Sequence, residues 1–70
     1  MDIKSNVDLE KLNRIDSGQS FEYRDIVKED LPLSRHPEDG ALFKKEVEDG
    51  VVDDVVVSDP GANHIEYKKL

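Results

Sequence analysis

The chain has 70 residues, with 17 acidic and 10 basic side chains, a formal net charge of -7 and no cysteine. That length allows one small domain, and the lack of cysteine excludes a disulfide framework or a thiolate metal site. No apolar run approaches the roughly 18–20 residues of a membrane-crossing helix, and no signal-peptide core follows Met1. A cytoplasmic protein without membrane contact is therefore expected.

Most of the excess negative charge falls in one segment. Residues 46–63 hold six acids and no base: Glu46, Glu48, Asp49, Asp53, Asp54 and Asp59. Proteins that bind nucleic acid usually present a positive face, because they neutralise phosphates. The overall charge therefore opposes DNA binding, and any DNA contact must use a local basic patch.

A first helix is expected over residues 6–16, with Ser5 or Asn6 as its N-cap. Three apolar residues at helical spacing form its buried stripe: Leu9, Leu12 and Ile15. Gly18 ends this helix, because glycine readily adopts left-handed backbone angles. Residues 19–21 follow as a strand too short for more than a single bridge.

A second helix is expected over residues 23–30. Its apolar residues fall on one helical face: Tyr23, Ile26 and Val27, followed by Leu31. Acidic Glu22 and Asp25 near the start suit the positive end of the helix dipole. Pro32 ends the helix, because the residue before a proline avoids helical backbone angles.

Residues 37–49 allow two interpretations. The sequence Pro-Glu-Asp at 37–39 is typical of the first turn of a helix. Three apolar residues would share one face of that helix: Leu42, Phe43 and Val47. The alternative makes 41–47 a strand followed by a hairpin turn at 48–50, which leads to a small β-meander barrel. The Pro-Glu-Asp start favours the helix, and Gly50 suits a left-handed helix end.

The end of the chain is rich in β-branched residues. Strands are expected over 51–57, where valines dominate, and over 63–69, where Ile65 and Tyr67 alternate with polar residues. The sequence Asp-Pro-Gly at 59–61 is typical of a turn between them. Three helices, a short strand and a C-terminal hairpin then form one α+β domain over residues 1–70.

Two stretches of the chain show a family resemblance: SGQSFEYRDIV at 17–27 and LFKKEVEDGVV at 42–52. They resemble a winged helix-turn-helix domain of the archaeal and bacterial transcriptional-regulator type. The first stretch is similar to the end of helix 1, strand 1 and the opening of helix 2, and the second to the end of the recognition helix. Ile-Glu-Tyr at 65–67 is similar to the returning strand of the wing. The resemblance covers residues 7–70.

The resemblance implies DNA binding and transcription regulation. In winged helix domains the third helix enters the major groove, and the wing meets the backbone or minor groove. The implied DNA-binding residues come from the recognition helix and its start, from helix 2 and from the wing: Arg35, His36, Lys44, Lys45, Arg24, Lys28, Asn63 and His64. The implied partner is double-stranded DNA, and a homodimer would read a longer stretch of it.

Several of these residues also have a purely structural interpretation. Lys44 and Lys45 can lie on a solvated helix face, and Arg35 can pair with an acid of the following turn. The tip of the wing, residues 58–63, lacks the basic residues that a DNA-inserting wing usually shows. These alternatives stay open at the level of the sequence.

The six acids of residues 46–59 support a function of a different class. As one negative surface they would bind a basic protein partner, in the way that acidic nucleic-acid mimics do. The structural alternative is a solubilising surface. A winged helix used only for protein contact is a further interpretation.

No sequence pattern indicates an enzyme. None of the carboxylates stands isolated in an apolar stretch, and neither a nucleophile–base pair nor a phosphate-binding glycine loop is present. His36 and His64 lack the local spacing of a metal motif. No catalytic residue, metal or cofactor is therefore expected.

Overall fold

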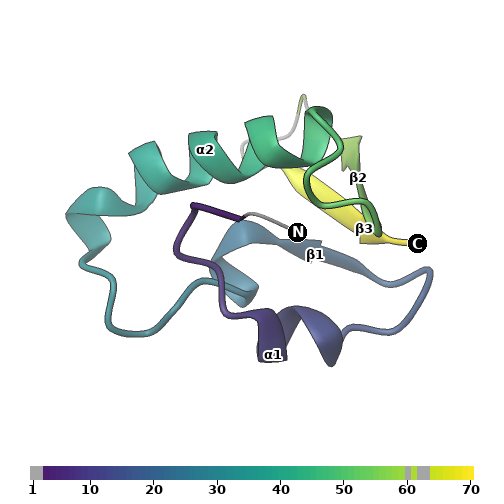
Figure 1. Ribbon diagram of the computed structural model, residues 1–70, viewed down its shortest axis with the longest axis horizontal. Helices are drawn as coiled ribbons and strands as arrows, with labels where there is room; N and C mark the ends of the chain where they lie inside the picture. Colours follow the sequence, from purple (N-terminus) through teal and green to yellow (C-terminus); the bar gives the residue numbers. More distant parts are fainter. Residues whose placement is uncertain (1–2, 60, 62–63) are drawn as a thin grey trace.

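The computed structural model describes residues 3–59, 61 and 64–70 and has an α+β fold. Its sheet has three antiparallel strands: β1 (Ser20–Glu22), β2 (Val55–Asp59) and β3 (Glu66–Lys69). Its helices are α1 (Leu9–Asn13) and α2 (His36–Glu48), with single 3-10 turns at η1 (Tyr23–Asp25) and η2 (Leu33–Arg35). Figure 1 shows α2 above the strands and α1 below them. Within the described residues, every helix is too short or too polar to cross a membrane.

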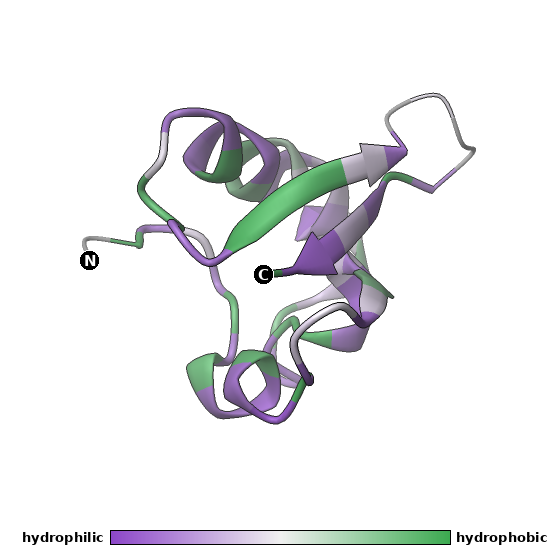
Figure 2. Cartoon of the chain, turned by 90° about the vertical axis from the view of Figure 1, so that its right-hand side faces the viewer, coloured by the Kyte–Doolittle hydropathy of each residue, from purple (hydrophilic) through white to green (hydrophobic). Residues whose placement is uncertain are grey.

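The C-terminal hairpin is present as predicted, and β3 is the central strand of the sheet, between β1 and β2. Tyr67 on β3 lies opposite Phe21 of β1 and Val57 of β2. The apolar residues of β2 form a continuous stretch that gives way to polar residues at its end (Figure 2). A register shift between Val57 and Asp59 interrupts the pairing there. Both hairpin strands begin later than predicted: residues 51–54 form bends and a turn before β2, and β3 begins at Glu66 instead of in a strand over 63–69.

The core lies between α2, the sheet and the N-terminal segment. Its buried cluster is apolar: Val7, Leu12, Phe21, Ile26, Phe43, Val47, Val52, Val55 and Tyr67. The ring of Tyr67 stacks on Phe21 at 5.7 Å between centroids and meets Phe43 edge-on at 4.9 Å. These contacts attach α2 and β1 to the central strand, and aromatic pairs of this geometry stabilise a fold beyond simple burial.

Residues 41–47 are helical, so the predicted helix is confirmed and the strand that leads to a β-meander barrel is wrong. Pro37 lies in the first turn of α2, where its missing N–H is not needed. At the other end Gly50 has a φ of +79°, and the N–H groups of Gly50 and Val51 donate to the carbonyls of Val47 and Glu46. This pairing is a Schellman ending, which satisfies the last carbonyls of the helix.

The buried face of α2 differs from the predicted one. Leu42 was expected to share it with Phe43 and Val47, but its side chain is 37% exposed. Asp39 and Glu46 take part in that face instead, at 7% and 6% exposure. The apolar pattern is misleading here because both carboxylates are buried with hydrogen-bond partners from the N-terminal segment.

The helix predicted over residues 23–30 is wrong. The chain makes one 3-10 turn at η1, and Val27 then pairs with Val7 in an isolated antiparallel bridge. The carbonyl of Ile26 accepts from Asp8 N–H at 2.7 Å, and Lys28 N–H donates to Asn6 at 2.9 Å. The N-terminal segment thus takes up the backbone groups that a helix would have paired internally.

The same bridge shortens the first helix, which was predicted over 6–16. Because Asn6 and Val7 are engaged with residues 27 and 28, helix α1 begins only at Leu9. Its N-cap is Asp8, whose carboxylate accepts from the N–H of Glu10 at 3.0 Å. The predicted caps are therefore wrong, although Leu12 is buried as expected.

Candidate nucleic-acid interface

A groove of about 710 Å³ lies where η1, the first half of α2 and the start of β3 meet. Six of its lining residues offer carbon surface: Tyr23, Leu33, Pro37, Ala41, Ile65 and Tyr67. Gly40 lines it as well, and a Cβ added there would meet the Tyr23 ring at 3.6 Å. The floor of the groove is thus largely apolar, and polar residues lie around it.

The groove brings together four of the eight residues implied in DNA binding: Arg24, His36, Lys44 and His64. They come from three separate parts of the chain. Arg24 lies on η1, His36 and Lys44 on α2, and His64 in the segment before β3. Local sequence patterns do not reveal this convergence, because it depends on how α2 packs against β3.

The other four implied residues lie elsewhere or are not described. Arg35 precedes α2 and is exposed, and Lys45 is exposed on α2, but neither lines the groove. Lys28 lines a second groove, beside α1. Asn63 lies outside the described residues. The structure therefore separates Lys28 from the other implied contacts.

The charge around the groove is more positive than that of the chain as a whole. Among the described residues that line it, Glu22 is the one carboxylate. Its Oε1 lies 3.4 Å from Nε of Arg24, whose side chain is 66% exposed. Because the Arg24 side chain is largely in solvent, this pair is weak and Arg24 keeps its capacity to bind another anion. Lys44 and two histidines add to this local excess of donors.

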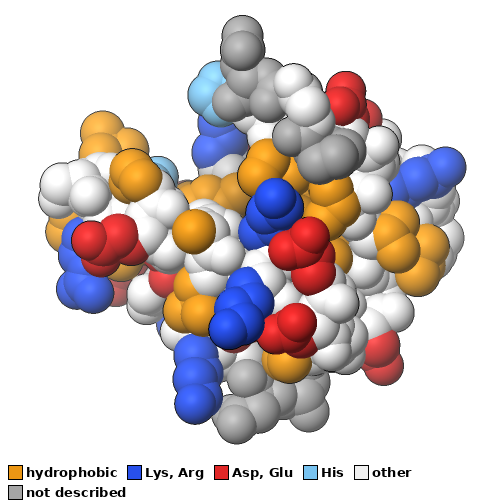
Figure 3. Space-filling view, turned by 90° about the horizontal axis from the view of Figure 1, so that it is seen from above, with side chains coloured by type: hydrophobic (Ala, Val, Ile, Leu, Met, Phe, Trp, Pro, Cys, Tyr) orange, Lys and Arg blue, Asp and Glu red, His pale blue; other side chains and the backbone are white. Residues whose placement is uncertain are grey.

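The solvent-facing side of α2 has a mixed charge. Figure 3, which views the molecule from the α2 side, shows basic and acidic side chains interspersed across this face. Lys45 and Glu48 are both exposed on the helix, as is Glu38 in its first turn. Uniform positive charge is therefore absent from the described part of this face, and two cations, Arg24 and Lys44, line the groove.

The ring of His36 is held by two neighbours. Its Nε2 lies 3.3 Å from the carbonyl oxygen of Leu31, a group that can only accept a hydrogen bond. The same ring meets Tyr23 edge-on, with centroids 5.8 Å apart. His36 is thus oriented toward the turn before α2 as well as lining the groove.

Tyr23 forms part of the groove and links η1 to α2. Its hydroxyl donates a short hydrogen bond to the carboxylate of Asp39. Burial raises the pKa of Tyr23 above its usual value, and the hydrogen bond to Asp39 and the charge of that carboxylate raise it further. The sequence predicted Tyr23 only as part of the apolar face of a helix over 23–30. Its part in the site follows from this link to α2, a residue pair 16 positions apart.

The six acids of residues 46–59 do not form one exposed surface. Glu46 is buried and accepts from the N–H groups of Lys4 at 2.6 Å and Ser5 at 3.3 Å, and from the Ser5 hydroxyl. Asp54 forms an ion pair with Lys69 Nζ at 3.1 Å. The remaining members are exposed: Glu48, Asp49, Asp53 and Asp59. The expected surface of six acids is therefore reduced to four, because Glu46 is buried in hydrogen bonds and Asp54 is paired with Lys69.

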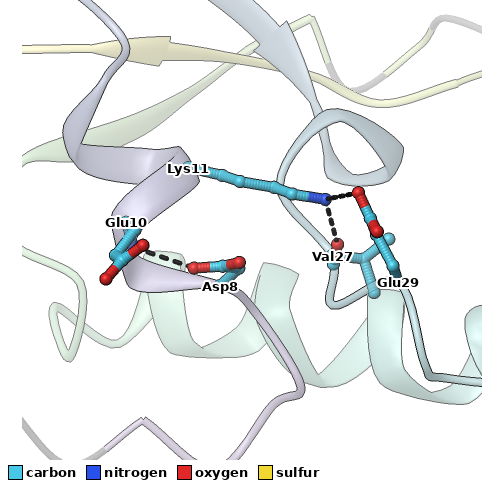
Figure 4. A network of polar contacts seen from close by, with 5 residues as sticks. All are labelled: Asp8, Glu10, Lys11, Val27 and Glu29. Carbon is cyan, nitrogen blue, oxygen red and sulfur yellow. Dashed lines mark hydrogen bonds and ion pairs between the residues drawn. The ribbon is translucent and has the colours of Figure 1, made fainter.

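In the second groove, beside α1, several lining side chains make hydrogen bonds that stabilise the fold. Lys11 Nζ donates to the carbonyl of Val27 at 3.2 Å and lies 3.4 Å from Oε1 of Glu29 (Figure 4). Asp8 caps the helix through the N–H of Glu10 in the same view. These contacts tie α1 to the segment after η1. Across the described part of the chain, no three His, Cys, Asp or Glu side chains gather to hold a metal ion.

Comparison of this chain with protein-family models, curated proteins and solved structures gave no match. The geometry of the groove is therefore the basis for assigning a function.

Proposed function

We propose that this chain is a small DNA-binding regulator of the winged-helix type. In this proposal α2 is the recognition helix and the β2–β3 hairpin is the wing. The observation that supports it is the convergence of Arg24, Lys44 and His64 around one groove. DNA would lie across this groove, with phosphates near the cations and base edges near the first half of α2.

The order of the elements supports the same proposal. A short helix, a short strand, the long helix and a hairpin follow one another, and β1 pairs with the second strand of the hairpin. One departure is that a 3-10 turn at η1 stands where the family resemblance implies helix 2. Contacts to DNA from this region would therefore come from Arg24 alone rather than from a helix surface.

The negative net charge limits this function without preventing it. Glu48 lies four residues after Lys44 on α2 and its charge acts on Tyr67, so it opposes a phosphate at the groove. Exposed charges farther away than about 10 Å are largely screened at 0.1 M salt. Few cations line the groove, so few phosphates would be neutralised. The dependence of affinity on salt should then be shallow, with a slope near −0.9 for each phosphate contacted.

The first test of this proposal is the binding of a mixed-sequence duplex, followed by fluorescence anisotropy at several salt concentrations. Replacing both Arg24 and Lys44 by Gln should weaken binding about tenfold or more, because each removes a charge-assisted contact. It should also reduce the salt slope by about two. A matched control replaces Lys4 and Arg14 by Gln, which removes the same charge from exposed positions outside the groove.

Equal loss of affinity in the two double variants would mean that DNA responds only to net charge, and would contradict the proposed interface. Absence of binding by the unmodified protein at low salt would contradict DNA binding altogether.

A further inference from the structure

The floor of the groove is apolar and partly exposed, which contact with phosphates does not require. Leu33 on η2 is 80% exposed and lines the groove together with Ala41 and Ile65. Transfer of a leucine side chain out of water is favourable, so its exposure next to other apolar residues is unfavourable in isolation. Clustered exposed apolar residues of this kind commonly mark a protein-binding surface.

The cations beside this floor favour a partner with negative charge. Arg24 and Lys44 line the groove, and the carboxylate that lines it, Glu22, is already near Arg24. The rest of the chain carries the acids that produce the net charge of -7. An acidic partner would therefore be repelled by most of the surface and attracted here, whereas a basic partner would be drawn to other faces.

From this combination we infer that the groove binds an acidic amphipathic segment of a partner protein. An apolar side chain of the segment would lie on Leu33, Ala41 and Ile65, and flanking carboxylates would face Arg24 and Lys44. The volume of about 710 Å³ lies within the roughly 300–1,000 Å³ of typical ligand sites and holds a few side chains. Such a segment would use the cations proposed for DNA, so the two ligands would exclude each other. The inference itself does not depend on DNA binding.

The test uses the 15N-labelled protein and two synthetic peptides. One peptide places leucines at helical spacing among aspartates and glutamates, and the other has the same acids with serine for every leucine. Only the leucine peptide should shift the amides of residues 33–44 and 64–67. Shifts of equal size with both peptides, or none with either, would overturn the inference.

Two leucine variants distinguish binding in the groove from non-specific hydrophobic binding. Leu33→Ser should weaken binding of the leucine peptide about fivefold or more, since the Leu33 side chain is 80% exposed and forms part of the floor. Leu9→Ser is the matched control, because Leu9 is 48% exposed on α1 and lines the other groove. Equal affinity of the Leu33→Ser variant and the unmodified protein would contradict the docking site.

Adding duplex DNA to the same samples separates this inference from the proposed function. Displacement of the leucine peptide by DNA supports both. DNA binding without peptide binding overturns the peptide site alone, and peptide binding without DNA binding overturns the proposed function alone. Groove amides that shift with protein concentration, without peptide, would identify a second copy of the chain as the occupant and would overturn the partner assigned here.

Discussion

At the scale of single residues, two buried carboxylates on α2 hold the N-terminal segment. Asp39 accepts from the backbone and side-chain N–H groups of Asn6 at 2.9–3.0 Å, and Glu46 accepts from Lys4 and Ser5. The Ser5 donors are buried, and the hydrogen bonds of Lys4 and Asn6 are partly buried. A buried N–H without a partner destabilises a fold by about 1–3 kcal/mol, so both acids serve stability rather than surface charge.

Glu46→Ala should therefore lower the free energy of unfolding by about 2–4 kcal/mol, because it leaves more than one donor unpaired. Glu46→Gln should be milder, since its carbonyl oxygen still accepts from a backbone N–H. Urea unfolding of each variant measures the difference. The exposed neighbour Glu48→Ala serves as control and should change stability by less than about 0.5 kcal/mol. A Glu46→Ala protein as stable as the Glu48→Ala protein would show that the segment is not held this way.

At the scale of elements, α2 is defined by its two ends. Pro37 suits the first turn, and Gly50 takes the left-handed conformation that reverses the chain into the turn before β2. Space is not the constraint at Gly50, because a Cβ there would have no atom within 4 Å. The constraint is its φ of +79°, which residues with a Cβ adopt at a cost.

Gly50→Ala should consequently destabilise the protein by about 1–2 kcal/mol through backbone strain alone. Gly40→Ala tests the same change inside α2, where the new methyl group would make an ordinary contact with Tyr23 at 3.6 Å. That variant should be neutral or more stable by up to about 1 kcal/mol, since alanine favours helix over glycine. Thermal unfolding compares the two, and a Gly50→Ala protein as stable as the Gly40→Ala protein would contradict a left-handed helix end.

At the scale of the whole molecule, one buried ring connects the layers. Tyr67 is 1% exposed and packs against Phe43 of α2 and Phe21 of β1. Burial raises the pKa of Tyr67 from 10.0 to about 12, and the negative charge of Glu48 adds to the effect. The folded protein therefore holds this phenol proton more tightly than the unfolded chain does.

Stability should fall as the pH rises from about 10 to about 12, because Tyr67 ionises first in the unfolded chain and so favours it. Below that window both states keep the proton, and the contribution of Tyr67 is constant. Tyr67→Phe keeps the ring but cannot ionise, so it should lose less stability across the same window. Urea unfolding at several alkaline pH values compares the two proteins. Parallel losses in both would show that Tyr67 is not responsible.

The site was predictable only in part. Arg24, His36, Lys44 and His64 were named from the sequence through a family resemblance, and the structure brings these four to one groove. Their grouping could not be predicted, because it depends on the packing of α2 against β3. The apolar floor was missed for a related reason. In the sequence Leu33 and Ile65 resemble ordinary core residues, and only the tertiary structure shows that Leu33 is exposed and that both line the groove.

Local chemistry determined the main helix and the hairpin. Their signals act between near neighbours: a proline and a left-handed glycine bound α2, and β-branched residues around a turn specify the strands. Tertiary structure alone decided that residues 23–30 form no α-helix and that Asp39 and Glu46 are buried. In each case the deciding partners are backbone groups of residues 4–8, far away in sequence. A buried backbone group needs a hydrogen-bond partner. The segment 4–8 therefore pairs with residues 26–28 in place of a helix over 23–30, and its N–H groups bind the buried carboxylates of Asp39 and Glu46.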